Sequence, residues 1–228
     1  MSASSKRKIV FLFGSGASIP AGMPKTQDIT ERILSGEGIY YQYNHFSSQL
    51  RRWAAPILEE VQRSDVQRII KFLEKLKVEV DSYYQKRIFK QDTNYEDLYY
   101  VANQISASIY GNHDNPVVQS FIDRISPDIK QILVKPIGGY EWRLEELSHK
   151  AQEYIKFVIF YLLNKEPACL NHLSLLKDYY FDSDNCKLEI FTLNHDTVIE
   201  QFFNKNQIDY VDGFSKAPEL IDGIQLRR

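Results

Sequence analysis

The sequence predicts an α/β fold, in which a Rossmann-like parallel sheet carries a large helical insertion between its first strand and its later strands. Three observations predict it. Segments of strand character stand near both ends of the chain, an apolar run at residues 9–13 and the segment KLEIFTL at residues 187–193. The long stretch between them places apolar residues mostly at helical spacing. A glycine-rich turn follows the first run, as it does in many nucleotide-binding sheets.

The first apolar run leads directly into this glycine turn. Residues 9–13 are apolar without alternation, which is typical of a parallel strand covered on both faces. The segment 14–18 (GSGAS) follows. A strand, a glycine turn and a helix start can cradle a pyrophosphate, because the backbone comes close and N–H groups face the anion. Ile19 stands at the third glycine position, so the dinucleotide fingerprint is partial and a plain tight turn remains the alternative.

The next segment is expected to form a loop and then a short helix. Pro20, Gly22 and Pro24 exclude a continuous helix and predict a loop over whatever the glycine turn holds. Thr26 is the expected N-cap of a helix that runs to residue 34. Gly36 should end that helix.

The middle of the chain, residues 47–165, is expected to be almost entirely helical. A T-x-x-E capping box at Thr93 opens one helix. Pro116 stands at the first position of another, and a long helix covers residues 140–164. A further helix should start at Pro167.

Strand character returns at residues 187–193, and a polar segment, Asn194-His195-Asp196, follows at once. Residues 197–204 should form a short helix and residues 208–211 a third strand, which together make a βαβ unit. The sequence therefore predicts one domain over residues 1–228. Its Rossmann-like part comprises residues 1–36 and 185–228, and its helical insertion residues 37–184.

Composition excludes several classes of protein. The formal net charge of −2 gives no overall electrostatic footprint for nucleic acid. Cys169 and Cys186 match no zinc-binding spacing, so we expect no metal and two reduced thiols. The apolar runs are too short for a signal peptide core or a membrane span. We expect a cytoplasmic protein without membrane or direct nucleic-acid contacts.

Two segments together resemble the sirtuin (silent information regulator) family. Gly14-Ser15-Gly16-Ala17-Ser18, followed by Ala21-Gly22-Met23-Pro24, resembles the sirtuin opening G-A-G-x-S … G-x-P. Thr192-Leu193-Asn194-His195-Asp196 resembles the sirtuin T-x-N-x-D block at the end of a later strand. Tyr95-Glu96-Asp97-Leu98 and Asp212-Gly213-Phe214 look like weaker accessory matches. The subgroup that the chain most resembles is the sirtuin-like NAD hydrolases of bacterial anti-phage defence, in which a helical block separates the two motifs and no zinc ribbon is present.

The chain departs from this family in one respect. Sirtuin-like enzymes carry a catalytic histidine in an H-G motif after the D-G-F-like segment. None of the five histidines here is followed by glycine. Only three clear strands are predicted, fewer than a doubly wound layer needs. We therefore expect the chain to be a C-terminally incomplete piece of a longer protein.

The resemblance implies an NAD+ glycohydrolase that cleaves NAD to nicotinamide and ADP-ribose, with NAD as substrate. It implies that residues 14–18 contact the phosphates and that Pro24 and its neighbours border the nicotinamide. It also implies that Asn194 and Asp196 contact the ribose or nicotinamide. The predicted catalytic residues are Asn194, Asp196 and His195. The predicted NAD-binding residues are Gly14, Ser15, Gly16, Ala17, Ser18, Gly22, Pro24, Asn194 and Asp196.

Each of the polar residues also has a purely structural interpretation. Asn194 could be a turn residue in a left-handed conformation, and Asp196 could cap the helix that follows it. His195 could be an exposed loop residue that does not accept a proton, and Ser15 could cap the turn. Glu96 and Asp97 need no explanation beyond acids in the first turn of a helix.

Two other functions remain open. A non-catalytic module that senses NAD or ADP-ribose would need the same glycine turn, but it would not need the catalytic histidine that this sequence lacks. Protein deacylation, as in zinc-bearing sirtuins, is disfavoured by the absent cysteine module. By resemblance we expect a homo-oligomer, with a partner protein or an additional C-terminal domain, acting as an effector of anti-phage defence.

Overall fold

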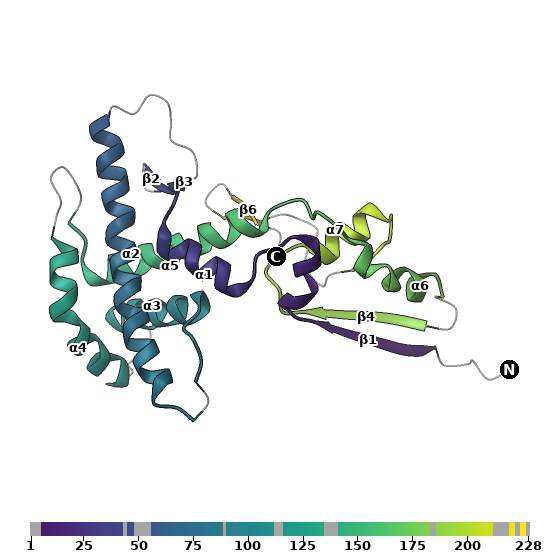
Figure 1. The fold of residues 1–228 in the computed structure, drawn as a ribbon, viewed down its shortest axis with the longest axis horizontal. Helices are drawn as coiled ribbons and strands as arrows, with labels where there is room; N and C mark the ends of the chain where they lie inside the picture. The colour runs from purple at the N-terminus through teal and green to yellow at the C-terminus, as the bar shows by residue number, and fades with distance from the viewer. Residues whose placement is uncertain are drawn as a thin grey trace. The chain divides into compact units, whose positions relative to one another are not determined.

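The structure is a computed structural model, and it describes residues 6–42, 45–47, 56–88, 90–111, 116–134, 141–182, 186–211, 219–221 and 224–226. The chain divides into two compact units. We call Met1–Gly22 with Glu166–Arg228 the sheet unit, and Met23–Lys165 the helical unit. The sequence-based division at residues 36 and 184 differs, because the first helix packs on other helices of the insertion. Figure 1 labels the elements of both units.

The sheet unit is built on two parallel strands that come from distant parts of the chain. Strand β1 (Arg7–Phe13) pairs with β4 (Cys186–Thr192), in a register that runs from Arg7 opposite Cys186 to Phe13 opposite Thr192. Both predicted end strands therefore exist and pair in parallel. The chain is mixed α/β and mostly helical, with a small parallel sheet of two strands among the described residues.

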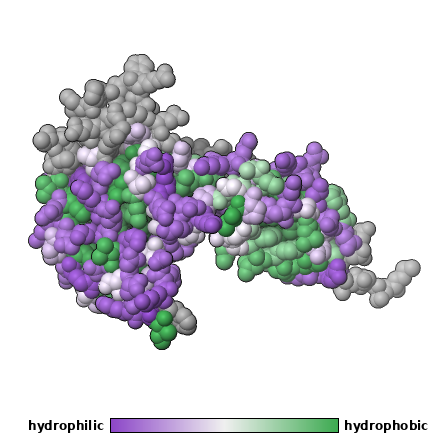
Figure 2. All heavy atoms as spheres, viewed as in Figure 1, coloured by the Kyte–Doolittle hydropathy of each residue, from purple (hydrophilic) through white to green (hydrophobic). Residues whose placement is uncertain are grey.

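Within the described part of the sheet unit, this sheet is covered on one face, so the prediction that β1 is covered on both faces is wrong there. On the covered face Phe11 stacks on Phe13 and lies against Tyr179 of α6 (Leu175–Phe181). Side chains alternate between faces along a strand, so the intervening residues point the other way. On that other face Leu12 is 70% exposed, and Phe191, its partner on β4, is 56% exposed. Figure 2 shows this apolar surface over β1 and β4.

Other elements of the sheet unit also correct the sequence prediction. After β1 the chain forms two short 3-10 turns, η1 (Ser15–Ala17) and η2 (Ile19–Ala21), in place of a helix start. The segment after Pro167 is irregular until η3 (Asn171–Leu173), because Ala168 N–H donates to Ala21 O at 2.8 Å instead of opening a helix.

The predicted third strand at residues 208–211 is absent. The preceding helix α7 (Val198–Lys205) ends before this segment, and Ile208 N–H donates to Phe203 O of that helix at 2.9 Å. Ile208 is buried against that helix, whereas Val211 is 95% exposed. Two antiparallel strands that the sequence did not predict follow, β5 (Glu219–Ile221) and β6 (Ile224–Leu226).

The helical unit contains five helices and one hairpin in its described part; the helices agree with the predicted periodicity, whereas the hairpin was not predicted. The helices are α1 (Thr26–Ser35), α2 (Pro56–Gln85), α3 (Tyr95–Ile109), α4 (Pro116–Leu133) and α5 (Leu144–Leu163). The hairpin joins β2 (Tyr40–Gln42) to β3 (His45–Ser47). The predicted start of the long helix at residue 140 lies outside the described residues. Gly36 ends α1 in the left-handed conformation at φ 61°, as predicted.

Local capping differs from the sequence prediction by about one residue. Helix α3 is capped by Asn94, whose side chain accepts N–H bonds from Glu96 and Asp97, instead of by Thr93. Thr93 is used elsewhere, because it donates to Asp81 at the end of α2. Thr26 is the first residue of α1, and Lys25 precedes it as the cap.

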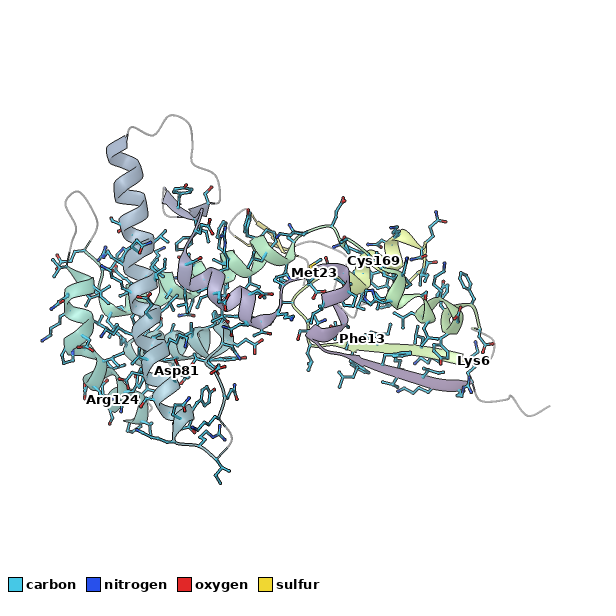
Figure 3. The ribbon with its side chains drawn as sticks, in the orientation of Figure 1. Lys6, Phe13, Met23, Asp81, Arg124 and Cys169 are labelled. Carbon is cyan, nitrogen blue, oxygen red and sulfur yellow. The ribbon has the colours of Figure 1, made fainter. Side chains whose placement is uncertain are left out.

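Long-range bonds join the helices of this unit. Buried Tyr154 on α5 donates its hydroxyl to Ile33 O on α1 at 2.7 Å, and burial raises the pKa of this tyrosine. Tyr95 N–H donates to Thr30 Oγ1 at 3.0 Å, which ties α3 to α1. Arg124 on α4 pairs with Glu79 on α2 (Figure 3). None of the helices in the described ranges is long and apolar enough to cross a membrane.

Candidate functional site

The carboxyl ends of β1 and β4 meet at one edge of the parallel sheet. Phe13 and Thr192 are paired there, and Leu193 N–H donates to Phe13 O at 3.1 Å. Figure 3 labels Phe13 at the end of β1, where the glycine turn begins. The turn and the polar segment after β4 therefore leave the sheet side by side. Ligands of open α/β sheets bind beyond this edge.

Asn194 bridges the two segments with its side-chain amide. Its Nδ2 donates to Gly14 O at 3.1 Å and to Ser18 Oγ at 2.9 Å. The carbonyl of Gly14 can only accept a hydrogen bond, so the amide nitrogen must face it. Asn194 Oδ1 is buried and has no hydrogen-bond partner in the described part of the chain. An unpaired buried acceptor costs free energy, so a ligand donor or a water at this atom would be favourable.

The two glycines of the turn leave open space beside the backbone. Neither Gly14 nor Gly16 has a positive φ, so the conformation of the turn does not itself require glycine. A Cβ built on either residue would meet no described atom within 4 Å. The N–H groups of Ser15 and Gly16 make no hydrogen bond to other described residues. Free donors beside an unobstructed backbone suit the close approach of an anionic or polar ligand.

A second segment, residues 168–172, also contacts the turn and the residues that follow it. Ala168 N–H donates to Ala21 O at 2.8 Å, and Gly22 lies so close to Ala168 that a Cβ would approach the alanine Cβ to 3.3 Å. His172 Nε2 lies 2.8 Å from Ala17 O. Sequence reasoning missed His172, since no local pattern signals a contact across 155 residues.

The structure also describes the remaining predicted polar residues of the sheet unit. Asp196 Oδ1 accepts the Val198 N–H at 3.1 Å and so supports the start of α7, as its structural interpretation requires. His195 is exposed in the bend after β4, and Ser15 is exposed at the tip of the turn. Ser18 is almost fully buried, at 3% exposure, with its hydroxyl on Asn194.

Other predicted positions fall outside this cluster. Pro24 belongs to the helical unit, so its predicted contact with nicotinamide stays a prediction. Asp97 is used within the helical unit, where it accepts the Tyr84 hydroxyl at 2.7 Å and the Asn94 N–H at 3.0 Å. The accessory segment 212–214 lies outside the described residues.

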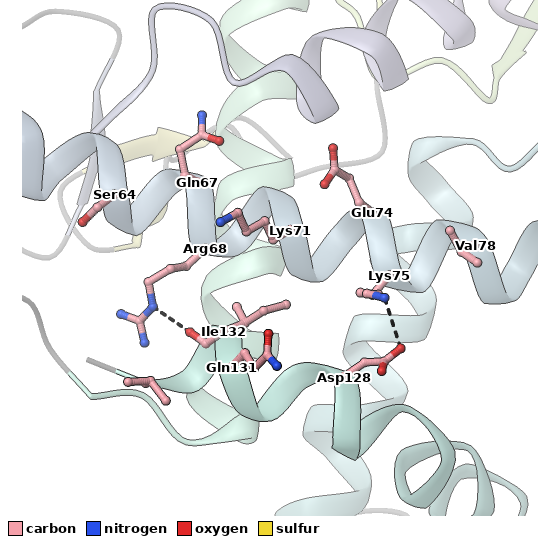
Figure 4. A pocket seen from close by; sticks show the side chains of 11 residues that line it. Ser64, Gln67, Arg68, Lys71, Glu74, Lys75, Val78, Asp128, Gln131 and Ile132 are labelled. Atoms are coloured by element: carbon pink, nitrogen blue, oxygen red, sulfur yellow. Dashed lines mark hydrogen bonds and ion pairs between the residues drawn. The ribbon is translucent and has the colours of Figure 1, made fainter. Parts of the chain in front are cut away.

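The helical unit has a groove of about 800 Å³ between α2 and α4 (Figure 4). Its lining mixes charges of both signs, and Lys75 Nζ pairs with Asp128 across it at 3.1 Å. Buried Arg68 reaches the end of α4 and donates to Ile132 O at 2.9 Å and Leu133 O at 3.0 Å. The guanidinium satisfies carbonyls at the helix end, so it has a structural role.

Within the described ranges, no three His, Cys, Asp or Glu side chains gather as a metal site. Comparison with protein-family models, curated proteins and solved structures finds no match to the chain.

Proposed function

We propose that this chain is an NAD+ glycohydrolase domain of the sirtuin-like class, with a Rossmann-like sheet and NAD as its substrate. The observation that supports the proposal most is the pairing of Asn194 with the Gly14 turn at the carboxyl ends of two adjacent parallel strands. The motifs that resemble the two sirtuin signatures lie far apart in sequence. A ligand that needs both would find them side by side.

The turn supplies the contacts that a dinucleotide phosphate requires. The N–H groups of Ser15 and Gly16, which make no hydrogen bond to other described residues, can donate to phosphate oxygens, and the lack of side chains on Gly14 and Gly16 lets the backbone approach. The buried Oδ1 of Asn194 can accept from a ribose hydroxyl or from the attacking water. These groups bind and orient the ligand.

The proposed chemistry needs little acid catalysis. Nicotinamide leaves the ribose as a neutral molecule, and the C1′ carbon becomes oxocarbenium-like as the glycosidic bond breaks. Water adds to that carbon and releases one proton, which gives ADP-ribose. Holding the ribose and stabilising the developing charge is the main contribution that the protein can make. As an effector of anti-phage defence, the enzyme would be held inactive until infection.

The test is to incubate the full chain with NAD and to quantify nicotinamide and ADP-ribose by chromatography. Gly16→Val fills the open space of the turn and should reduce turnover and NAD affinity at least tenfold. Ile19→Val, an exposed change next to the turn, should leave both unchanged. The proposal is rejected if the folded chain neither binds nor cleaves NAD under any activating condition.

One observation favours a second candidate, a non-catalytic sensor of NAD or ADP-ribose. The amide nitrogen of Asn194 is already engaged by the glycine turn, which suits a residue that shapes a binding site. Titration calorimetry separates the two candidates. Saturable binding of intact NAD without nicotinamide release would favour the sensor.

A further inference from the structure

A histidine that is distant in sequence, His172, contacts the middle of the glycine turn. His172 Nε2 lies 2.8 Å from Ala17 O, on the residue between Gly16 and Ser18. A carbonyl oxygen only accepts, so Nε2 carries the hydrogen in this contact. The same peptide unit is also bonded on its other side, because Ser18 N–H donates to Ser15 O at 3.1 Å. The peptide plane between Ala17 and Ser18 is thus fixed at both ends.

The segment that carries His172 is itself anchored. Leu170 and Leu173 are buried on either side of the histidine, at 8% and 3% exposure. Ala168 N–H is bonded to Ala21 O, which fixes the beginning of the segment against the end of the turn. His172 is therefore presented to the turn from a supported backbone, although its own side chain is exposed.

We propose that His172 is a positioning residue that keeps the glycine turn in its ligand-ready shape. This inference rests on the proposed function for its choice of ligand, NAD. Asn194 is bonded to Gly14 O and Ser18 Oγ of the turn, and His172 contacts Ala17 O. With both contacts present, the turn keeps the shape in which the N–H groups of Ser15 and Gly16 make no hydrogen bond to other described residues. A preformed site loses less conformational entropy when the ligand binds.

The histidine acts through the turn, because its Nε2 is occupied by Ala17 O. A side chain of similar reach with an N–H donor should replace the histidine, whereas an aromatic ring without a donor should not replace it. His172→Gln retains an N–H donor, and His172→Phe keeps an aromatic ring but has no donor. His149→Phe is the matched control, since His149 is an exposed histidine of the helical unit that lies 3.5 Å from Glu153.

The experiment combines amide hydrogen exchange of the free chain with NAD titration calorimetry. In His172→Phe, exchange of residues 14–22 should rise several-fold and NAD affinity should fall roughly five- to thirtyfold, as expected when a pre-organising contact is lost. His172→Gln should stay within about threefold of the wild type in both measurements, as a variant that keeps the hydrogen bond. His149→Phe should change neither. Circular dichroism establishes that each variant is folded.

Two results would overturn the inference. One is an unchanged exchange rate at residues 14–22 in folded His172→Phe. The other is an equal loss of affinity in the Gln and Phe variants. If the wild type does not bind NAD but His172→Phe still loosens the turn, the proposed function fails and the positioning role of His172 stands.

Discussion

The side-chain amide of Asn194 donates to the main-chain carbonyl of Gly14, 180 residues earlier in the chain, across 3.1 Å. This bond joins the segment after β4 to the segment after β1 at the edge where both parallel strands end. The same nitrogen also reaches Ser18 Oγ at 2.9 Å. This side chain thus makes two of the contacts that hold the turn, so it is an informative position to change.

Replacing the Asn194 amide by a carboxylate should destabilise the sheet unit. In Asn194→Asp an acceptor replaces the donor that faces Gly14 O, so the expected loss is about 1–3 kcal/mol of unfolding free energy. Asn194→Ala removes the bonds without adding repulsion and should cost about 1 kcal/mol. Urea denaturation at neutral pH measures both. Asn171→Asp, an exposed change, is the control and should alter the unfolding free energy little. If Asn194→Asp proved more stable than Asn194→Ala, the bond from the Asn194 amide to Gly14 O would be contradicted.

Alanine at two glycines of the turn should have opposite effects on stability. Gly22 has φ 85° and lies against Ala168, so Gly22→Ala is strained and should cost about 1 kcal/mol or more. Gly16 has no positive φ and no neighbour in the way, so Gly16→Ala should be neutral or stabilising by up to about 1 kcal/mol. Thermal unfolding compares them. Equal destabilisation by both changes would show that the backbone conformation of the turn requires glycine at position 16. The open space beside Gly16 would then be no evidence for a ligand.

Asp81 should make the helical unit sensitive to acid. Partial burial alone would raise the pKa of this carboxyl, but bonds from Lys77 and Thr93 outweigh burial and lower the pKa below its ordinary value of 3.8. The stabilisation is therefore complete above the ordinary value and is lost as pH falls through the lower native value. Figure 3 labels Asp81 on α2.

The measurement is the urea midpoint of the wild type and of Asp81→Asn between pH 2 and pH 7. The wild type should be more stable than the variant near neutral pH, and the difference should shrink below pH 4. Asp123→Asn, an exposed change on α4, controls for general charge effects. A difference that stays constant across the acid range would contradict the lowered pKa.

Two leucines of the sheet unit should respond differently to truncation. Leu173 is 3% exposed, so Leu173→Ala should cost about 2–5 kcal/mol through lost burial and a cavity. Leu12 is 70% exposed on the uncovered face of the sheet, so Leu12→Ala should stay within about 0.5 kcal/mol. Chemical denaturation gives both values. A large loss at Leu12 would mean that another surface covers this face in solution.

The sequence predicted elements well where a local pattern sufficed. Hydrophobic periodicity indicated the helices of the insertion, and apolar runs indicated β1 and β4. It failed where neighbours compete for the same groups. The capping role moved from Thr93 to Asn94 because Asp81, from another helix, binds Thr93. Residues 208–211 (IDYV) resembled a strand, yet Ile208 packs at the end of α7.

The candidate site divides in the same way. The glycine turn and Asn194 could be named from sequence, because each stands directly after an apolar run and forms part of a motif. His172 could not, because its partner is a backbone carbonyl, and every residue type presents the same carbonyl.

The order of the residues alone indicated the helices of the insertion, the strands β1 and β4, and the short motifs that stand where those two strands end. Only the tertiary structure decided that β1 lies beside β4, which face of the sheet is covered, and which groups reach the turn. The physical reason is range: secondary structure follows from the spacing of neighbouring side chains, whereas these contacts join residues more than 150 positions apart.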